Sequence, residues 1–170
     1  MAGKTQHDSE TLATGQQVIT AVAFIHHDFD GTPKVFMPRR AATKKFLPGV
    51  FELVGGHVDY GENIIAGLKR EALEEIGMRI SVGDPFGCFT YTNEIKGSHS
   101  AEIIYFAQFA DGPDGIVLEP EDHATYGWFT EEEFEATAKS FENADWPRIT
   151  LHSYTVRWGE AAKDPRYADL

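Results

Sequence analysis

The stretch GHVDYGENIIAGLKREALEEIGM, residues 56–78, carries most of the information in this sequence of 170 residues. Within it, residues 63–76 have the spacing of a helix, because their bulky apolar side chains recur every three or four positions and share one face. The residues on that face are Ile65, Leu68, Ala72 and Ile76. Gly77 follows directly and suits the left-handed conformation that ends many helices. The stretch therefore predicts a loop, a helix that packs on a core, and a tight turn.

Three glutamates of this helix form a second pattern. Glu71, Glu74 and Glu75 lie at positions i, i+3 and i+4, so their carboxylates share one patch. Like charges at this spacing destabilise an isolated helix by roughly a few tenths of a kcal/mol per pair, and a cation would offset the repulsion. Oxygen ligands without nearby cysteine or clustered histidine favour Mg²⁺ or Mn²⁺ over zinc, and Mg²⁺ is commonly shared with phosphate groups. The alternative is a solvated helix face with ordinary ion pairs.

The whole stretch fits the pattern G-x5-E-x7-R-E-U-x-E-E-x-G-U, in which U is an aliphatic residue. The fixed positions are Gly56, Glu62, Arg70, Glu71, Ala72, Glu74, Glu75, Gly77 and Met78. This pattern resembles the Nudix box, and the flanking residues 36–40, 47–56 and 128–130 are similar to the segments that surround the box in that family. Ala72 and Met78 are mild departures at the two aliphatic positions.

The resemblance implies an α/β fold in one domain, with a mixed β-sheet between helices (α/β/α). It implies a MutT-like hydrolase that cleaves a nucleoside diphosphate linked to another moiety, of the nucleoside triphosphate or NDP-sugar type, by attack of water on phosphorus. The expected cofactor is Mg²⁺, with Mn²⁺ as a second choice. The alternative is a Nudix-fold sensor that binds a nucleotide without cleaving it.

By the same resemblance, each box residue has an expected role. The implied metal-binding residues are Gly55, Glu71, Glu74 and Glu75, and Glu74 has a second reading as the base that activates water. Arg70 is expected to orient a box glutamate. The residues expected to be structural are Gly56, Glu62 and Gly77. In several Nudix enzymes the base comes from a later loop, where the candidates here are Glu121, our choice, and Glu119 and Asp122.

Two arginines end a predicted strand in front of the box. The guanidinium groups of Arg39 and Arg40 suit bidentate contacts with phosphate. Because adjacent strand residues point to opposite faces, we expect at most one of them to touch a substrate phosphate.

Composition limits the partners of the chain. Fifteen Lys and Arg against 27 Asp and Glu give a net charge of −12, which disfavours nucleic-acid binding through phosphate contacts. No apolar run approaches the roughly 20 residues of a membrane helix. The one cysteine excludes an intramolecular disulfide and suits a reducing cytoplasm. We therefore expect a cytoplasmic protein with a small nucleotide as substrate, and by analogy with relatives a homodimer.

The remaining predictions concern the organisation of the chain. We expect a flexible N-terminal arm over residues 1–16, the Nudix domain over 17–162 and a loose tail over 163–170. Strands are predicted at residues 18–25, 35–37, 50–54, 86–92, 101–109 and 126–130. Thr130 is expected to cap a helix that runs to residue 138. Residues 148–158 fit a helix or a strand, and we prefer the helix. Cys88, between Phe86 and Phe89, is expected in the core.

Overall fold

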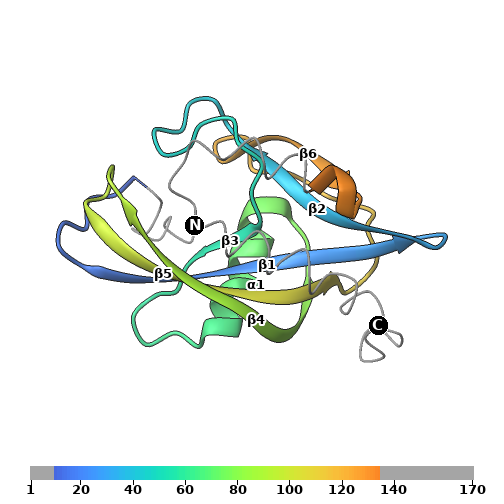
Figure 1. Cartoon of the computed structure of the whole chain (residues 1–170), viewed down its shortest axis with the longest axis horizontal. Coiled ribbons are helices and arrows are strands. Elements are labelled where there is room, and N and C mark those ends of the chain that lie inside the picture. The colour runs from blue at the N-terminus through green and yellow to red at the C-terminus, as the bar shows by residue number, and fades with distance from the viewer. Residues whose placement is uncertain (1–9, 135–170) are drawn as a thin grey trace.

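Strand β1 lies in the middle of a mixed six-stranded sheet. The structure is a computed structural model that describes residues 10–134 (Figure 1). Its elements are β1 (Gln17–Phe29), β2 (Thr32–Arg40), β3 (Val54–His57), α1 (Ile64–Ile76), β4 (Ile80–Asn93), β5 (Ser98–Phe109) and β6 (His123–Phe129). The order along the sheet is β4-β5-β1-β2-β6, and β3 also pairs with β1. Strands β1 and β5 are parallel and every other pair is antiparallel, so the predicted mixed sheet is confirmed.

One edge of β1 is shared by two partners, and this positions the box. Residues 20–23 of β1 pair with β3, whereas residues 26–29 pair with β2. The β3 strand, which carries Gly55 and Gly56, therefore lies where the partner of β1 changes. The other edge of β1 pairs continuously with β5 over residues 17–25.

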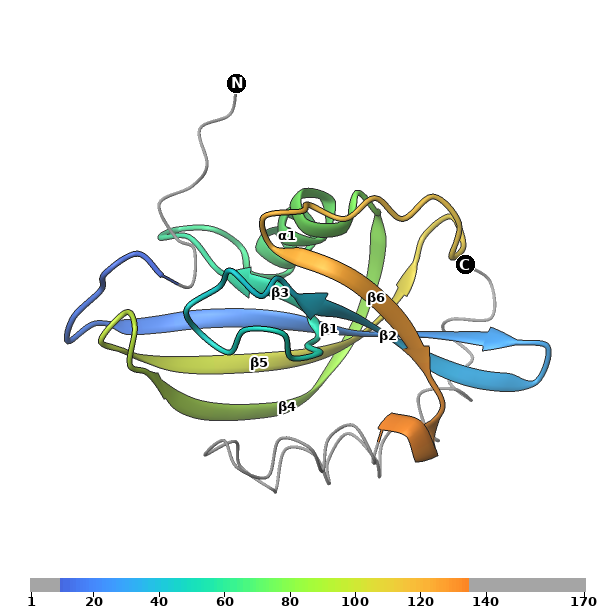
Figure 2. The same ribbon diagram turned by 90° about the horizontal axis from the view of Figure 1, so that it is seen from above.

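Side chains of β1 alternate between two apolar layers, as the period of two in a strand requires. Ala21, Ala23 and Ile25 pack with the apolar face of α1. Val22 and Phe24 point the other way and pack with Phe134. Figure 2 shows α1 on one side of the sheet and the helical turn that begins at residue 131 on the other. The α/β fold predicted from the sequence is confirmed.

Helix α1 begins and ends where its sequence predicts. The Asn63 side chain caps it by accepting hydrogen bonds from the backbone N–H groups of Ile65 and Ala66, at 3.0 and 3.1 Å. Gly77 ends it with a φ of +66°, and its N–H donates to the carbonyl of Leu73 at 3.2 Å. In residues 10–134, no helix is long and apolar enough to cross a membrane.

The predicted cap at Thr130 is also present. The Thr130 hydroxyl accepts from the Glu133 N–H at 3.3 Å, and the Glu133 carboxylate accepts from the Thr130 N–H at 2.9 Å. This reciprocal pair is a capping box. The predicted continuation to residue 138, the helix at 148–158 and the boundary after residue 162 lie outside the described residues.

Two local predictions were wrong. The strand expected at 50–54 is a single bridge between Phe51 and Arg39, and regular pairing starts at Val54. Two backbone hydrogen bonds join this segment to β2, from the Arg40 N–H to the Val50 carbonyl at 2.8 Å and from the Glu52 N–H to the Pro38 carbonyl at 3.0 Å. Cys88 is exposed. It alternates with the buried Phe89 on β4, an edge strand, and points away from the layer that Phe89 joins.

Residues 10–16, which the sequence places in the N-terminal arm, contact the turn between β4 and β5. The Ala13 N–H donates to the Lys96 carbonyl and the Gly15 N–H to the Gly97 carbonyl, both at 2.9 Å. Ala13 is buried by this contact. This part of the chain therefore lies against the same end of the sheet as the first residues of β1.

Candidate active site

Arg70 ties the loop before α1 to the helix itself. Its Nε and Nη2 donate to the two oxygens of Glu62 at 3.0 and 3.1 Å, and Nη2 also donates to the His57 carbonyl at 3.0 Å. The Asp59 N–H donates to the same Glu62 carboxylate at 3.0 Å. The hydrogen bond from Arg70 is the main reason that the pKa of Glu62 is lowered. Glu62 therefore closes the loop as an ionised acceptor.

The same guanidinium reaches two further box glutamates. Nη1 of Arg70 donates to Glu71 at 2.6 Å and to Glu74 at 3.3 Å. The Glu71 side chain is 14% exposed and that of Glu74 is 54% exposed, so the two carboxylates differ mainly in their access to water. Burial raises the pKa of Glu71 to about 7, although the hydrogen bond from Arg70 opposes the shift. Arg70 thus orients Glu71 while leaving Glu74 largely solvated.

Glu75 lies on the sheet side of the patch. Its Oε2 accepts a hydrogen bond from the Gly55 N–H at 3.2 Å. Burial raises the pKa of Glu75 well above its usual value, and the negative charges of Glu52, Glu71 and Asp122 raise it further. The charges of three carboxylates from different parts of the chain therefore act on Glu75.

The two glycines of β3 allow close approaches to their neighbours. Gly55 has a φ of +140°, and a Cβ atom there would lie 2.1 Å from the carbonyl oxygen of Ala21 on β1. A Cβ on Gly56 would lie 2.9 Å from Oε2 of Glu71. Only glycines let β3 approach β1 on one side and the glutamates of α1 on the other.

The donor set fits a hard divalent cation. It consists of oxygen atoms, and its carboxylates are partly buried and repel one another, a state that a bound cation relieves. Over the described residues 10–134, no three Asp, Glu, His or Cys side chains are placed so that together they could hold a metal ion. Mg²⁺ does not need three, since it commonly takes one or two carboxylates together with water and phosphate oxygens. Glu71 and Glu75 can supply those carboxylates.

An ionic network beside Glu75 was not predicted from the sequence. Arg40 Nη1 donates to both oxygens of Glu52 at 3.1 Å, and Nε2 of the buried His123 lies 2.8 Å from Oε1 of Glu52. Lys44 forms an ion pair with Asp122. The network joins residues 40–52, β6 and the box. An acid inside the apolar run 50–54 was the one sign of it in the sequence.

The two arginines of β2 point in different directions, as strand geometry requires. Arg40 is buried, and Glu52 and the Phe46 carbonyl accept its hydrogen bonds. Arg39 is exposed, where its Nε donates to the Gly49 carbonyl at 2.8 Å and its guanidinium lies 5.8 Å from the centre of the Phe51 ring. Of the two, Arg39 is the one that a ligand in solution can reach.

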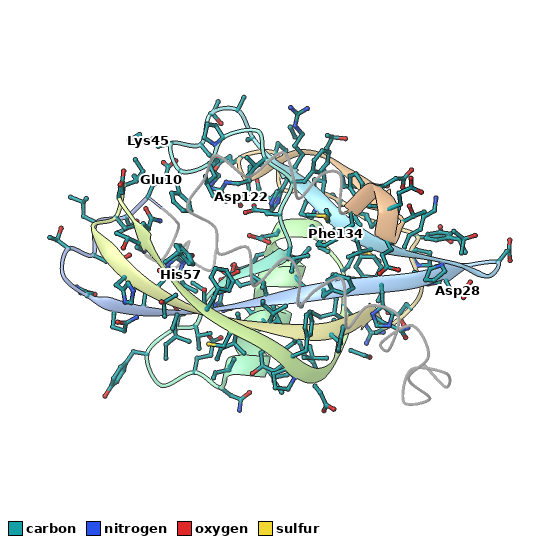
Figure 3. All side chains as sticks on the ribbon, viewed as in Figure 1. Glu10, Asp28, Lys45, His57, Asp122 and Phe134 are labelled. Carbon is teal, nitrogen blue, oxygen red and sulfur yellow. The ribbon has the colours of Figure 1, made fainter. Side chains whose placement is uncertain are left out.

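The loop before β6 packs against the end of α1. The Glu119 N–H donates to the Glu75 carbonyl at 2.8 Å. Glu121 is exposed, and its N–H donates to the Glu119 carboxylate at 3.3 Å. Asp122, labelled in Figure 3, is the acid of this loop whose charge acts on Glu75. Glu119 and Asp122 therefore adjoin the box, and Glu121 contacts Glu119.

Comparisons with known proteins identify the family of the chain. The NUDIX domain family matches residues 18–151. An uncharacterized Nudix hydrolase of Yersinia pestis is 34% identical over 116 residues, which are 66% of this chain and 59% of that protein. The chain thus spans about three fifths of the length of this relative.

Solved structures share the fold at lower identity. A MutT protein from Methanosarcina mazei has a TM-score of 0.63 and 21% identity over 87% of this chain and 96% of its own. An Ap4A hydrolase of C. elegans has a TM-score of 0.64 and 21% identity over 84% of this chain and 98% of its own. With the box residues assembled around α1 and a family match over most of its length, the chain belongs to the Nudix family.

Proposed function

We propose that this protein is a divalent-metal-dependent hydrolase of phosphoric anhydride bonds. Its substrate would be a nucleoside diphosphate linked to another moiety, and nucleoside triphosphates and NDP-sugars are the two classes we favour. The observation that supports this most is the position of Glu75, whose carboxylate faces the charges of Glu52, Glu71 and Asp122 at partly buried positions. Such a concentration of negative charge suits a site that binds polyanions through divalent cations.

In this proposal Glu71 and Glu75 are the main metal ligands, and Glu74 and the Gly55 carbonyl complete the set. A bound Mg²⁺ would screen the phosphates, lower the pKa of a water ligand and stabilise the leaving oxygen. Arg70 holds Glu71 in place through its 2.6 Å hydrogen bond. The Gly55 N–H holds Oε2 of Glu75. The protein thereby fixes both ligands before substrate arrives, which is the usual requirement of such sites.

The proton of the attacking water needs an acceptor. Glu74 and Glu121 are the two proposed bases, and both side chains are accessible to solvent. Arg39 is the proposed phosphate contact, since it is exposed, whereas Arg40 is engaged by Glu52. Replacing Glu74 and Glu121 by glutamine, one at a time, identifies which of them is the base. The variant that has lost the base should also lose the acidic limb of the profile of kcat against pH.

The second candidate function is a nucleotide sensor on the same fold. It would require nucleotide binding at the box without cleavage. All four glutamates of the box are present, and Arg70 contacts three of them. A site that had stopped cleaving would not need this set, so we favour the hydrolase.

One experiment tests the proposal. The purified chain is incubated with Mg²⁺ and a panel of nucleoside triphosphates, NDP-sugars and dinucleoside polyphosphates, and products are measured after phosphatase treatment. We expect turnover of at least one compound, and its loss in Glu75→Gln with the circular dichroism spectrum unchanged. Glu132→Gln, the same change at an exposed helix glutamate, should keep full activity.

Two results would contradict the hydrolase. One is binding of a nucleotide without turnover of any compound in the panel, which is the behaviour of the sensor. The other is turnover that survives both Glu75→Gln and removal of divalent cations by a chelator, because that activity would not arise at the box.

A further inference from the structure

Two aromatic rings face each other at one end of the sheet. Phe46, in the loop of residues 41–53, and Tyr91, on β4, are nearly parallel, with an angle of 15° and ring centres 6.1 Å apart. This separation lies in the upper part of the range of about 4.5–7 Å for aromatic pairs. Both residues are partly buried. One ring is thus carried by the sheet and the other by a loop that approaches it.

Polar side chains from three neighbouring strands lie beside Tyr91 on the same face of the sheet. The register places Thr20 on β1 opposite Glu102 on β5, and Ser100 on β5 opposite Tyr91 on β4. Thr20 Oγ1 donates to Glu102 Oε2 at 3.2 Å. Tyr91 also hydrogen bonds with Ser100 and Glu102. We call this group, Thr20, Tyr91, Ser100 and Glu102, the polar floor.

The polar floor lies on the face opposite α1, at the end that Phe134 does not reach. Val22 and Ile104, two residues further along their strands, belong to the apolar layer that packs with Phe134. In Figure 3, His57 marks the end of the sheet near the floor, and Phe134 marks the apolar end. This face thus changes from polar to apolar along β1. Glu102 is a buried ionisable group in a position where an apolar residue would serve packing alone.

The polar floor also adjoins the box. Thr20 pairs with His57 at the end of β3, and the His57 carbonyl accepts the 3.0 Å hydrogen bond from Arg70. Glu52 acts on both regions, because its negative charge raises the pKa of Glu75 and that of Glu102. The floor and the box therefore meet where β1 pairs with β3.

We propose that Phe46 and Tyr91 hold the nucleobase of the substrate by stacking, with Glu102 as the group that hydrogen bonds to the edge of the base. This rests on the proposed function only in placing the phosphates at the box. Bases stack on aromatic side chains in many nucleotide sites, and the carboxyl of Glu102 accepts from ring or amino N–H groups. The substrate is then a nucleotide recognised by its base, not a pyrophosphate compound recognised by charge alone.

The test measures binding, so that it does not depend on turnover. ADP, GDP, CDP and UDP are titrated with Mg²⁺ by calorimetry, with inorganic pyrophosphate as the probe that lacks a base. We expect at least one nucleoside diphosphate to bind tenfold or more tightly than pyrophosphate. Phe46→Leu should weaken that nucleotide by about tenfold, the low end of what stacking contributes, and change pyrophosphate by less than twofold. Phe46→Tyr, which keeps the ring, should restore nucleotide binding.

Glu102→Gln tests the proposed hydrogen bond to the edge of the base. It should change the ranking of the four nucleoside diphosphates and leave pyrophosphate unaffected, with urea unfolding as the check that the variant folds. The proposal is overturned if pyrophosphate binds as tightly as every nucleotide, or if Phe46→Leu weakens both kinds of probe equally. Turnover without base preference would overturn this inference and leave the hydrolase intact. Binding that depends on the base, without turnover, would support this inference and contradict the hydrolase.

Discussion

Arg70 and Glu62, eight residues apart in the sequence, form a two-point hydrogen-bonded ion pair at 3.0 and 3.1 Å. The pair closes the loop before α1, and the same guanidinium holds the His57 carbonyl and Glu71. One planar group with donors in a fixed fork makes all of these contacts. Arg70 and Glu62 thus form a structural clamp on the loop, and the Nη1 atom of Arg70 also orients Glu71.

Replacing Arg70 by lysine should loosen this clamp, because an ammonium group cannot reproduce the fork. We expect Arg70→Lys to lower the free energy of unfolding by about 2 kcal/mol. Loss of orientation at Glu71 should lower the proposed turnover by roughly 10–100-fold, as for other residues that position metal ligands. Urea denaturation and initial rates at saturating Mg²⁺ measure the two effects.

Arg79→Lys is the matched control for Arg70→Lys. Arg79 also pairs with an acid, Asp111, but both side chains are about two-thirds exposed, at 68% and 64%. An exposed pair of this kind contributes less than about 1 kcal/mol. Equal destabilisation by the two substitutions would show that the Arg70 clamp contributes no more than a surface ion pair.

A second prediction concerns the close approach of β3 to β1. Gly55→Ala would place a Cβ atom 2.1 Å from the Ala21 carbonyl, where backbone must move. We expect a loss of about 3 kcal/mol or more in the free energy of unfolding, or failure to fold. Gly31→Ala, at a φ of +87° with nothing within 4 Å of the new Cβ, should cost only about 1 kcal/mol. Thermal melts of both variants measure the difference, and similar melting temperatures would contradict it.

The local rules of the sequence predicted α1 well, because its signals are short-range. The apolar spacing and the stop at Gly77 both act within one helix. The same holds for the cap at Thr130. These features depend on neighbours a few residues away, and so a single sequence suffices to find them.

Features that depend on distant pairing were missed. The segment 50–54 looks like a strand by composition, yet Glu52 within it binds Arg40 and His123, which lie 12 and 71 residues away. Cys88 looks buried between two phenylalanines, but only pairing at the sheet edge determines which face it joins. The polar floor around Glu102 is also assembled by register between strands. Such contacts need the topology, which spacing along the chain does not contain.

The cap of α1 gives a third prediction. Asn63→Ala removes the acceptor of two hydrogen bonds, from the N–H groups of Ile65 and Ala66. It should lower the free energy of unfolding by about 1 kcal/mol. Asn63→Asp keeps the acceptor and should remain within a few tenths of a kcal/mol, roughly, of the parent. Urea unfolding of the three proteins tests this, and an equal loss in both variants would argue against the cap.

The last prediction concerns Glu102 and pH. Burial raises the pKa of Glu102 from 4.5 to about 7 despite its hydrogen bonds from Thr20 and Tyr91. The folded protein therefore binds a proton that the unfolded chain releases, and the free energy of unfolding falls as pH rises from about 4.5 to about 7. The full difference is of the order of 3 kcal/mol, at about 1.4 kcal/mol for each pH unit.

Urea unfolding at pH 5 and pH 8, with a chelator present, measures this loss in the parent protein and in Glu102→Gln. The chelator keeps divalent cations from changing the charges of Glu71 and Glu75, whose raised pKa values act in the same direction. Those two groups remain in the variant, so the difference between the two proteins isolates Glu102. The variant should lose less stability between pH 5 and pH 8 than the parent, whereas the exposed control Glu132→Gln should behave as the parent. If Glu102→Gln and the parent lose the same amount, Glu102 is ionised in the folded protein at pH 5, and the polar floor already holds a carboxylate at that pH.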